Sequence, residues 1–348
     1  MSKKVYVGLS GGVDSSVTAG LLKEQGYQVT GVFMKNWTKD MPGFACPWQE
    51  DYQDAKRVAV QLGIDFKVYD FEKEYRHKVV DYMVKEYQAG RTPNPDIMCN
   101  QEVKFKLFLE TAIEDGADLI ATGHYARIEK KNNRARLKVA KNIEKDQTYF
   151  LYRVSEEALK KSLMPIGEFA SKEEVRKVAK RLNLVTANKK DSQGICFVGK
   201  VGIKDFLLAE LGPQKPGKII DEAGKIIGEH DGAIYYTIGQ RHGLNLGGGF
   251  PYYVCSKDIK KNEIYVTTDL DNKNLWHKKL NLTDIHWIND KPLKKNTYQA
   301  RNRYRAPLVA CQVEDSIVEL NDSIRAITPG QSTVIYDGDF VLGGGVIR

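Results

Sequence analysis

Short apolar runs alternate with segments of helical periodicity through the first two hundred residues of this 348-residue chain. Residues 5–9, 29–34, 66–71 and 119–122 predict strands, and residues 16–25, 53–62, 74–88 and 104–115 predict helices. Parallel strands need a long crossover between them, and a helix normally supplies it. The alternation therefore predicts an α/β fold, with a doubly wound, Rossmann-like parallel sheet that is covered by helices on both faces.

Two further segments extend this pattern. Residues 125–140, with Lys130, Lys131, Asn132 and Asn133 at the tip, predict a hairpin that leaves the sheet. Residues 172–182 predict an amphipathic helix, because Ser171 is a suitable N-cap and Glu174 follows three residues later.

The residue pattern of the sequence changes after Lys200, where glycine becomes frequent. Glycine-rich turns, such as those at 231–232, 247–249 and 343–345, separate short β-branched and aromatic runs. This pattern predicts a small β-rich domain followed by a closed β-barrel. We expect an N-terminal catalytic domain at 1–200, a small β-rich central domain at 201–275 and a C-terminal β-barrel at 276–348.

Composition excludes several classes of protein. The chain is 42% hydrophobic and 28% charged, has no apolar run that could cross a bilayer, and begins without a secretory signal, so we expect a cytoplasmic protein with no membrane partner. Five scattered cysteines and the lack of any Cys-x-x-Cys argue against a disulfide framework and a zinc knuckle.

The charge favours a polyanionic partner. The net charge is +8, and residues 276–310 contain eight Lys or Arg but only two Asp. Strand alternation over 298–306 would place Arg301, Arg303 and Arg305 on one face, where they could bind phosphates, with Tyr304 on the other. A solvated charged strand is the alternative.

The segment Ser10-Gly11-Gly12-Val13-Asp14-Ser15 lies between the first predicted strand and the first helix. Glycines at such a junction let the backbone approach a phosphate, and the helix N-terminus favours an anion. The loop lacks the lysine of the Gly-x4-Gly-Lys-Ser/Thr motif. Asp14 would repel a bare phosphate, so it is expected to hold Mg²⁺ or to orient the loop.

Two cysteines lie in short polar turns. Cys99 follows the proline-containing segment 91–98 and is expected near a helix start, where the pKa of a thiol is lowered. Asp96, three residues earlier, could transfer protons. Cys196 lies in the turn 191–197. Buried structural thiols are the alternative for each cysteine, but two such turns beside a phosphate loop favour sulfur chemistry.

Taken together, these motifs resemble the tRNA-specific 2-thiouridylases, a family of the N-type ATP pyrophosphatase superfamily. The resemblance spans essentially the whole chain, and it is carried by the loop at 8–15, by Asn94-Pro95-Asp96 with Cys99, by Gly123-His124-Tyr125, by Asp146-Gln147-Thr148, by the Cys196 segment and by Thr237-Ile238-Gly239-Gln240-Arg241.

The resemblance implies roles for individual residues. ATP would be bound by Gly8, Leu9, Ser10, Gly11, Gly12, Val13, Asp14, Ser15, Met34 and Gly123. The target base would be received by Asn94, Pro95 and Asp96, with Cys99 as the nucleophile and Cys196 as the carrier of a persulfide sulfur. The tRNA would also be contacted by His124, Asp146, Gln147, Thr148, Arg303, Tyr304 and Gln331.

The implied reaction replaces the C2 oxygen of the wobble uridine in the tRNA anticodon with sulfur. That oxygen is a poor leaving group, so ATP, with Mg²⁺, would first convert it to an adenylate. Persulfide sulfur on Cys196, supplied by a sulfur-carrier protein or a cysteine desulfurase, would then attack C2, or would be released as sulfide that does so. A Cys99–Cys196 disulfide would remain for a reductant to open.

Three alternatives are compatible with the residues. A pyrophosphatase acting on a small acid or amide would explain the phosphate loop but not the paired cysteines. A non-catalytic RNA-binding protein with ATP as a structural ligand would leave Asp14 and the cysteines unexplained. An iron–sulfur enzyme could use Cys99, Cys196 and Asp96 as ligands, although four cysteines are usual.

Overall fold

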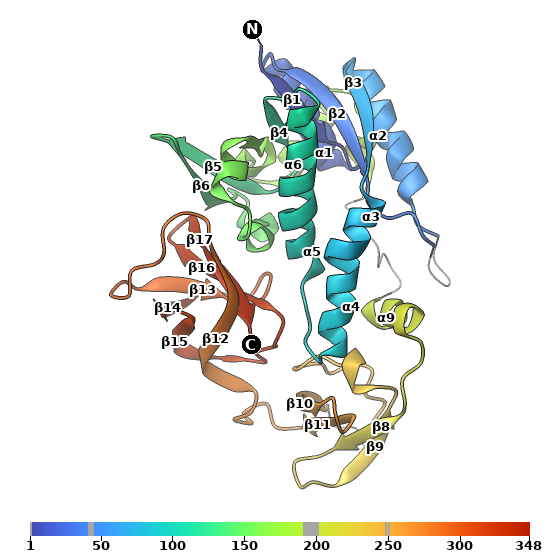
Figure 1. Ribbon diagram of the computed structural model, residues 1–348, viewed down its shortest axis with the longest axis vertical. Helices are drawn as coiled ribbons and strands as arrows, with labels where there is room; N and C mark the ends of the chain where they lie inside the picture. Colours follow the sequence, from blue (N-terminus) through green and yellow to red (C-terminus); the bar gives the residue numbers. More distant parts are fainter. Residues whose placement is uncertain (1, 41–44, 191–201, 248, 250) are drawn as a thin grey trace.

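The computed structural model describes residues 2–40, 45–190, 202–247, 249 and 251–348, and Figure 1 shows an elongated molecule. A parallel sheet lies at one end, a small sheet at the other, and a β-barrel lies beside them. In those ranges no helix is both long and apolar enough to cross a bilayer.

The first sheet is parallel throughout and has the strand order β3-β2-β1-β4-β7. Its strands are β1 (Lys4–Gly8), β2 (Gln28–Lys35), β3 (Asp65–Asp70), β4 (Leu119–Ala121) and β7 (Ser162–Leu163). The order reverses at β1, because β2 lies on one side of it and β4 on the other. Ligands of open α/β sheets bind at the carboxyl ends of the strands at such a switch point.

Helices cover both faces of this sheet, as the sequence predicts. Val5 and Val7 of β1 pack into one buried cluster with α1, α2 and α8, whereas Tyr6 packs into another with the helices of 72–114. The helices of this part are α1 (Val13–Glu24), α2 (Trp48–Leu62), α3 (Glu72–Tyr75), η1 (Arg76–Val80), α4 (Asp81–Gln88), α5 (Pro95–Met98), η2 (Cys99–Leu107), α6 (Phe108–Glu114), η3 (Ile143–Lys145), η4 (Thr148–Leu151), α7 (Glu156–Lys160), η5 (Pro165–Glu168), α8 (Lys172–Arg181) and η6 (Val185–Asn188). The predicted cap of α8 is confirmed, because the Glu174 amide donates to Ser171 Oγ at 3.2 Å.

The predicted hairpin is formed by β5 (Ala126–Lys131) and β6 (Arg134–Val139), with a turn at Asn132 and Asn133. Both asparagines have positive φ, 50° and 58°, as a tight two-residue hairpin turn requires. The hairpin leaves the parallel sheet, and β6 pairs antiparallel with β17 of the barrel. It therefore joins the first part of the chain to the last.

The middle of the chain forms a small four-stranded sheet of order β10-β11-β8-β9. Its elements are α9 (Ile203–Leu211), β8 (Gly217–Ile220), β9 (Ile226–His230), η7 (Ala233–Tyr235), β10 (Tyr253–Asp258) and β11 (Glu263–Thr267). Arg76 holds Glu210 of α9 through two hydrogen bonds of 2.8 and 2.6 Å, which ties this part to the α3–α4 helices.

The C-terminal part is a closed six-stranded barrel, because β12 pairs with both β15 and β17. Its strands are β12 (Trp276–Trp287), β13 (Tyr298–Arg301), β14 (Val309–Glu314), β15 (Ile317–Arg325), β16 (Ser332–Asp337) and β17 (Phe340–Ile347). The glycines at 343–345 allow this closure, since a Cβ on Gly343 would lie 2.1 Å from the carbonyl oxygen of His286 in β12. The predicted fold class is thus confirmed.

One predicted strand is wrong in its extent. The strand expected over 298–306 ends at Arg301, and the backbone turns through 302–305, with Arg305 at a φ of 62°. Arg301 therefore does not share an outer face with Arg303 and Arg305. Its side chain is only 12% exposed and lies 3.8 Å from the Asp146 carboxylate and over the ring of Tyr336.

Candidate active site

The phosphate loop of residues 10–15 connects β1 to α1 at the switch point of the parallel sheet. Serine hydroxyls hold its shape: Ser15 Oγ accepts the Ser10 amide at 3.1 Å, and Ser16 Oγ donates to the Gly12 carbonyl at 2.7 Å. Gly12 is the N-cap and has no side chain with which to cap the helix. The first amides of α1 are therefore available for an anion.

Two glycines let other elements approach this loop. Gly11 has a φ of +73°, and a Cβ there would lie 2.4 Å from the carbonyl oxygen of Asp51 in α2. Gly123 follows β4, and its Cβ would lie 2.7 Å from the Ser15 nitrogen and 2.8 Å from the Asp14 carbonyl carbon. Both sides of the loop thus leave no room for a side chain at these positions.

Met34 and Gly8 lie side by side on neighbouring strands. A Cβ on Gly8 would lie 2.9 Å from the Met34 terminal methyl, so a side chain there would displace Met34. The structure thus brings Gly8, Met34, Gly123 and the loop to one end of the sheet. Leu9 and Val13 are different, because both side chains are buried in the core, so only their backbones can face a ligand.

Asp14 is held by Lys172 and Tyr125, two contacts that the sequence analysis did not predict. Lys172 Nζ lies 2.8 Å from both carboxylate oxygens, and the Tyr125 hydroxyl donates to Oδ1 at 3.0 Å. Lys172 is the first residue of α8, where the helix dipole disfavours a positive charge, and Asp14 compensates it there. These contacts fix the Asp14 carboxylate in place at the first turn of α1.

The segment that contains Asp96 and Cys99 begins a helix. Asn94 is the N-cap and accepts the Asp96 amide at 3.2 Å, Pro95 is the first helical residue, and the helix continues through η2 and α6. The helix start predicted near residue 104 is therefore wrong. Cys99 is the fifth residue of this helix and so lies near its start, as expected, but its amide already donates to the Pro95 carbonyl.

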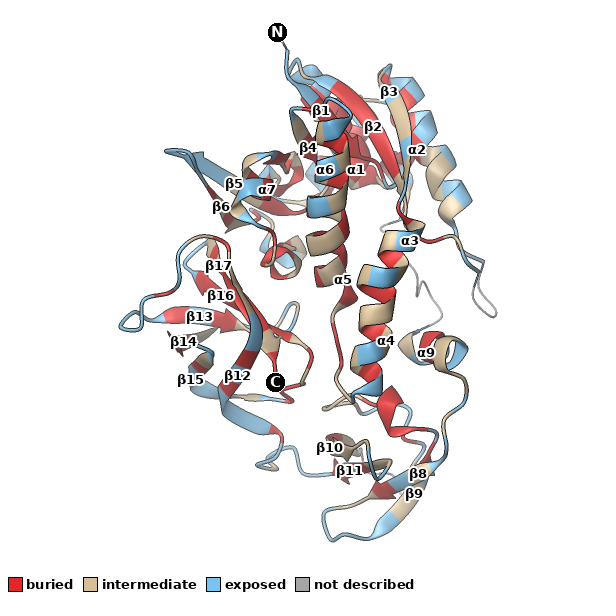
Figure 2. Cartoon of the chain, viewed as in Figure 1, coloured by how far each residue is buried: buried red, intermediate tan, exposed pale blue. Residues whose placement is uncertain are grey.

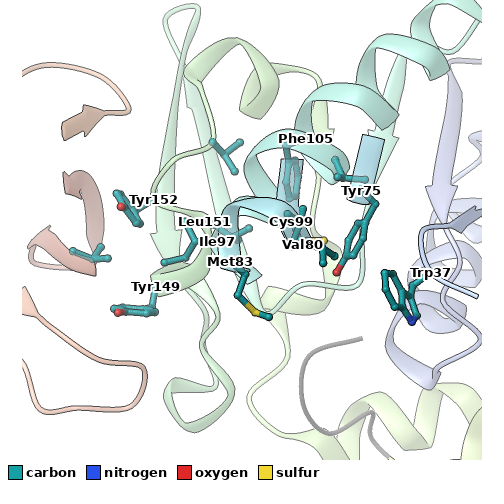
Figure 3. Packing of buried hydrophobic residues seen from close by; sticks show 14 of the residues in the cluster. Trp37, Tyr75, Val80, Met83, Ile97, Cys99, Phe105, Tyr149, Leu151 and Tyr152 are labelled. Atoms are coloured by element: carbon teal, nitrogen blue, oxygen red, sulfur yellow. The ribbon is translucent and has the colours of Figure 1, made fainter. Parts of the chain in front are cut away.

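Figure 2 shows buried residues, in red, on the parallel sheet and on the helices beside it. Cys99 is 4% exposed and lies in a large buried hydrophobic cluster (Figure 3). Figure 3 shows it among Trp37, Tyr75, Val80, Met83, Ile97 and Phe105. Cys196, the predicted persulfide carrier, and the rest of its segment lie outside the described residues.

Burial and the charge of Lys104 act on two ionisable side chains expected in the site, Asp96 and His124. Burial raises the pKa of the Asp96 carboxyl, and the positive charge of Lys104 opposes part of that rise. Burial also holds the pKa of His124 well below its ordinary value, and Lys104 acts in the same direction. His124 is therefore neutral, with Nδ1 2.8 Å from Thr122 Oγ1. The sequence analysis did not single out Lys104, whose charge acts on both groups.

Asp146 and Thr148, two of the residues expected to contact tRNA, are buried inside the protein. Asp146 accepts the Ala140 amide at 2.9 Å and the Thr148 hydroxyl at 2.6 Å, and burial raises the pKa of its carboxyl. Gln147 is half-buried, and its Oε1 accepts the Tyr125 amide at 2.9 Å. These contacts fix the chain between β6 and η4.

The remaining predicted tRNA contacts lie where the barrel meets the first part of the chain. Arg303 is exposed and is 3.3 Å from Thr328 Oγ1. The Tyr304 ring packs on the Phe150 ring with centroids 4.5 Å apart. Gln331 is half-buried, and its amide nitrogen donates to the Thr92 carbonyl at 2.8 Å.

Metal ligands do not cluster in the described ranges, where no three His, Cys, Asp or Glu side chains could hold one ion. A magnesium ion at Asp14 would have to displace Lys172 from both carboxylate oxygens, so the residues there do not form a ready magnesium site. The iron–sulfur alternative involves Cys196 and so extends beyond the described part of the chain.

Family models match the chain in three consecutive pieces. A model described as tRNA methyl transferase HUP domain matches residues 3–200. A tRNA methyl transferase PRC-barrel domain matches residues 204–268, and an aminomethyltransferase beta-barrel domain matches residues 277–347.

Similar curated proteins match over nearly the whole chain. Proteins of Listeria monocytogenes (49% identical), Bacillus subtilis (48%) and Methylobacillus flagellatus (46%) each bear the name tRNA-specific 2-thiouridylase MnmA. The alignments cover 99%, 99% and 100% of this chain and 94%, 94% and 99% of those proteins. With this identity over its full length, the chain belongs to the tRNA-specific 2-thiouridylase family.

Proposed function

We propose that this protein uses ATP to activate the C2 oxygen of the wobble uridine in a tRNA anticodon and replaces it with sulfur, which gives 2-thiouridine. One observation carries the proposal: the phosphate loop and the Cys99 helix meet through Gly123 and His124. Gly123 packs on the loop, and the ring of His124 lies 5.6 Å from the ring of Phe105, which belongs to the same helix as Cys99. An activated oxygen and a sulfur nucleophile can therefore share one site.

In the activation step, the chain binds the nucleotide and positions the base. The amides of the loop and of the α1 N-terminus would hold the phosphates, and Met34 and Gly123 would line the rest of the ATP site. The uridine C2 oxygen attacks the α-phosphorus, and the bond to the departing pyrophosphate breaks. The hydrogen bonds between Ser10 and Ser15 fix the shape of the loop in advance, so the other loop amides would stabilise the developing charge without reorganising.

In the sulfur step, the terminal sulfur of a persulfide on Cys196 forms a bond to C2, and the C2–oxygen bond breaks as AMP leaves. The Cys99 thiolate then attacks the Cys196 sulfur. The sulfur–sulfur bond breaks, and its electron pair stays on the sulfur that is now bonded to C2. A Cys99–Cys196 disulfide and 2-thiouridine result, and a dithiol reductant must reopen the disulfide. Burial raises the pKa of Asp96, so this carboxyl can take or return a proton at a higher pH than an ordinary carboxyl.

The three parts of the chain divide this work. We infer that residues 1–200 carry the chemistry, that 201–275 form a central spacer and that 276–348 grip the tRNA with exposed basic residues such as Arg303. An anticodon loop is already single-stranded, so its base enters a pocket at low cost. We further infer that the protein acts in the cytoplasm and takes its sulfur from a carrier protein or a cysteine desulfurase.

The test uses the full chain with tRNA, ATP, Mg²⁺, a cysteine desulfurase and cysteine, followed by mass spectrometry of the nucleosides. The parent should make 2-thiouridine and release AMP and pyrophosphate. Cys196→Ser should release pyrophosphate but accept no labelled sulfur, whereas Cys99→Ser should accept sulfur without completing its transfer. Parent-rate thiolation by Cys196→Ser would rule out the persulfide role.

Control arms of the same assay separate the rival functions. S-adenosylmethionine replaces the sulfur source in one arm, because the matched family model is named for methyl transfer. Small acids and amides replace tRNA in a second arm. An iron assay and a visible spectrum of anaerobically purified protein form the third. A methylated nucleoside would favour a methyltransferase, an adenylated small acid would favour a pyrophosphatase acting on small molecules, and stoichiometric iron would favour an iron–sulfur enzyme.

A further inference from the structure

Three parts of the chain meet at Thr92, two residues before the N-cap Asn94. On the barrel side, the side-chain nitrogen Nε2 of Gln331 donates to the carbonyl oxygens of Thr92 at 2.8 Å and Pro93 at 3.3 Å. The Thr92 amide donates in turn to the Pro329 carbonyl at 2.8 Å. The segment that leads into the Cys99 helix is thus bonded to the barrel from both sides.

The barrel residues of this joint are themselves fixed. The backbone amide of Gln331 donates to the Thr328 carbonyl at 3.1 Å, and the backbone carbonyl of Gln331 accepts the Ile347 amide at 2.8 Å. Gly330 has a φ of +93°, and a Cβ there would lie 2.8 Å from the Thr92 nitrogen. A glycine is therefore required for the two backbones to approach, and Gln331 is held in place by the last barrel strand.

The central part of the chain provides the third side. Thr237 Oγ1 lies 3.3 Å from Thr92 Oγ1. Thr237 begins the 237–241 motif, whose turn is closed by Gln240 through a 3.0 Å bond from the Thr237 amide to Oε1. A Cβ on Gly239 would lie 2.6 Å from the Ala326 Cβ, so the motif also packs on the barrel. This placement gives a role to a motif that the proposed chemistry does not use.

Little flexible chain separates this joint from the reacting residues. Only Pro93 and Asn94 lie between Thr92 and the helix, the two prolines 93 and 95 have fixed φ, and Asn94 caps the Asp96 amide. A displacement at Thr92 is therefore passed on to Asp96 and Cys99 rather than absorbed. We propose that Gln331 is a positioning residue, which aligns the Asp96–Cys99 helix by holding the Thr92 and Pro93 carbonyls. The proposal rests on the proposed function only in taking Cys99 as a reacting thiol.

This role differs chemically from the tRNA contact expected for Gln331. The amide nitrogen is engaged with two protein carbonyls, so only Oε1 remains to accept a hydrogen bond from RNA. A residue that only contacted tRNA would change the affinity for tRNA and would have no effect on Cys99 in the free protein. A positioning residue changes Cys99 before any tRNA is bound.

The experiment measures iodoacetamide alkylation of Cys99 in the full-length protein without tRNA, by peptide mass spectrometry. Gln331→Met keeps the side-chain length but removes the donor, and Gln331→Glu places a carboxylate against two carbonyl oxygens. The control Gln299→Met removes an exposed amide from β13 of the same barrel. Cys311, fully buried in the barrel core, reports any general loosening within the same sample.

We expect Cys99, which is 4% exposed, to be alkylated about five- to tenfold faster in Gln331→Met, because local opening no longer breaks the 2.8 Å hydrogen bond to Thr92 and the weaker 3.3 Å one to Pro93. The increase should be larger in Gln331→Glu, with kcat for thiolation falling more than KM for tRNA rises. Gln299→Met should match the parent. Unchanged Cys99 alkylation with a raised KM alone, or faster alkylation of Cys311 together with Cys99, would overturn the proposal. Absence of 2-thiouridine with the parent would refute the proposed function and leave the alkylation result interpretable.

Discussion

The sharpest test of the phosphate loop is Gly123→Ala, which adds a single methyl group. That carbon would lie 2.7 Å from the Ser15 nitrogen and 2.8 Å from the Asp14 carbonyl carbon. Both are backbone atoms of the first turn of α1, so no side chain can rotate to relieve the overlap. The backbone of Gly123 is accessible to alanine, since its φ is not in the left-handed region, and the effect is therefore purely steric.

The magnitude follows from the size of the overlap. Ordinary contact begins at 3.4 Å, so Gly123 and the loop must separate by about 0.7 Å. A misplacement of 1 Å in a catalytic site costs about a hundredfold in rate, and overpacking costs about 1–3 kcal/mol of stability. We expect tRNA-dependent pyrophosphate release to fall about thirtyfold. The Kd for tRNA should remain unchanged, because Gly123 packs against the phosphate loop and is not one of the residues expected to contact tRNA.

The assay is pyrophosphate release at saturating tRNA, with tRNA affinity measured separately by filter binding at fixed salt. Gly247→Ala is the matched control, because a Cβ there would meet nothing within 4 Å and its φ is not in the left-handed region. Gly123→Ala releasing pyrophosphate at the parent rate would refute the idea that close packing of Gly123 holds the loop in its working shape.

Other predictions concern charge. Lys172→Met should lower pyrophosphate release about tenfold or more, since it leaves the Asp14 carboxylate uncompensated beside the phosphates. Lys172→Arg keeps the positive charge and should retain more activity, so equal ATP kinetics in the two variants would contradict this reasoning. Because the pKa of Asp96 is raised and only the ionised carboxylate accepts a proton, thiolation should fall as the pH drops through a value above the ordinary carboxyl range, and Asp96→Asn should remove that limb of the pH profile. Replacing Arg303 and Arg305 with alanine should reduce the slope of log K against log salt by about one unit per lost phosphate contact, and an unchanged slope would show that neither binds phosphate.

The parallel sheet could be predicted because its strands carry a strong local signal. Strands buried on both faces read as unbroken apolar runs, as Val5, Tyr6 and Val7 show by packing into two different clusters. The phosphate loop could be predicted for the same reason, since its function depends on a glycine-rich junction between one strand and the next helix. Both are local properties of the chain, which a single sequence records.

Contacts between distant residues could not be predicted in this way. Lys172 looks like the first surface lysine of an amphipathic helix, yet its partner Asp14 lies 158 positions away in the sequence. Arg301 looks like one of three alternating arginines, yet the strand ends there and its charge is directed inward toward Asp146. Alternation specifies a face only while the strand continues, and a single asparagine, Asn302, is a weak signal that the strand ends at Arg301.

Several residues that the resemblance assigns to tRNA contact also join parts of the protein. Asp146 faces Arg301 of the barrel, Tyr304 of the barrel packs on Phe150, and Gln331 holds Thr92. Phe150 in turn accepts a 3.1 Å hydrogen bond from Asn100, the neighbour of Cys99. A tRNA that binds beside these joints therefore acts on side chains that already support the Cys99 helix. Loss of tRNA affinity in a variant of Tyr304 or Gln331 is consequently insufficient to assign a direct RNA contact, and reactivity of Cys99 in the free protein is the measurement that separates the two roles.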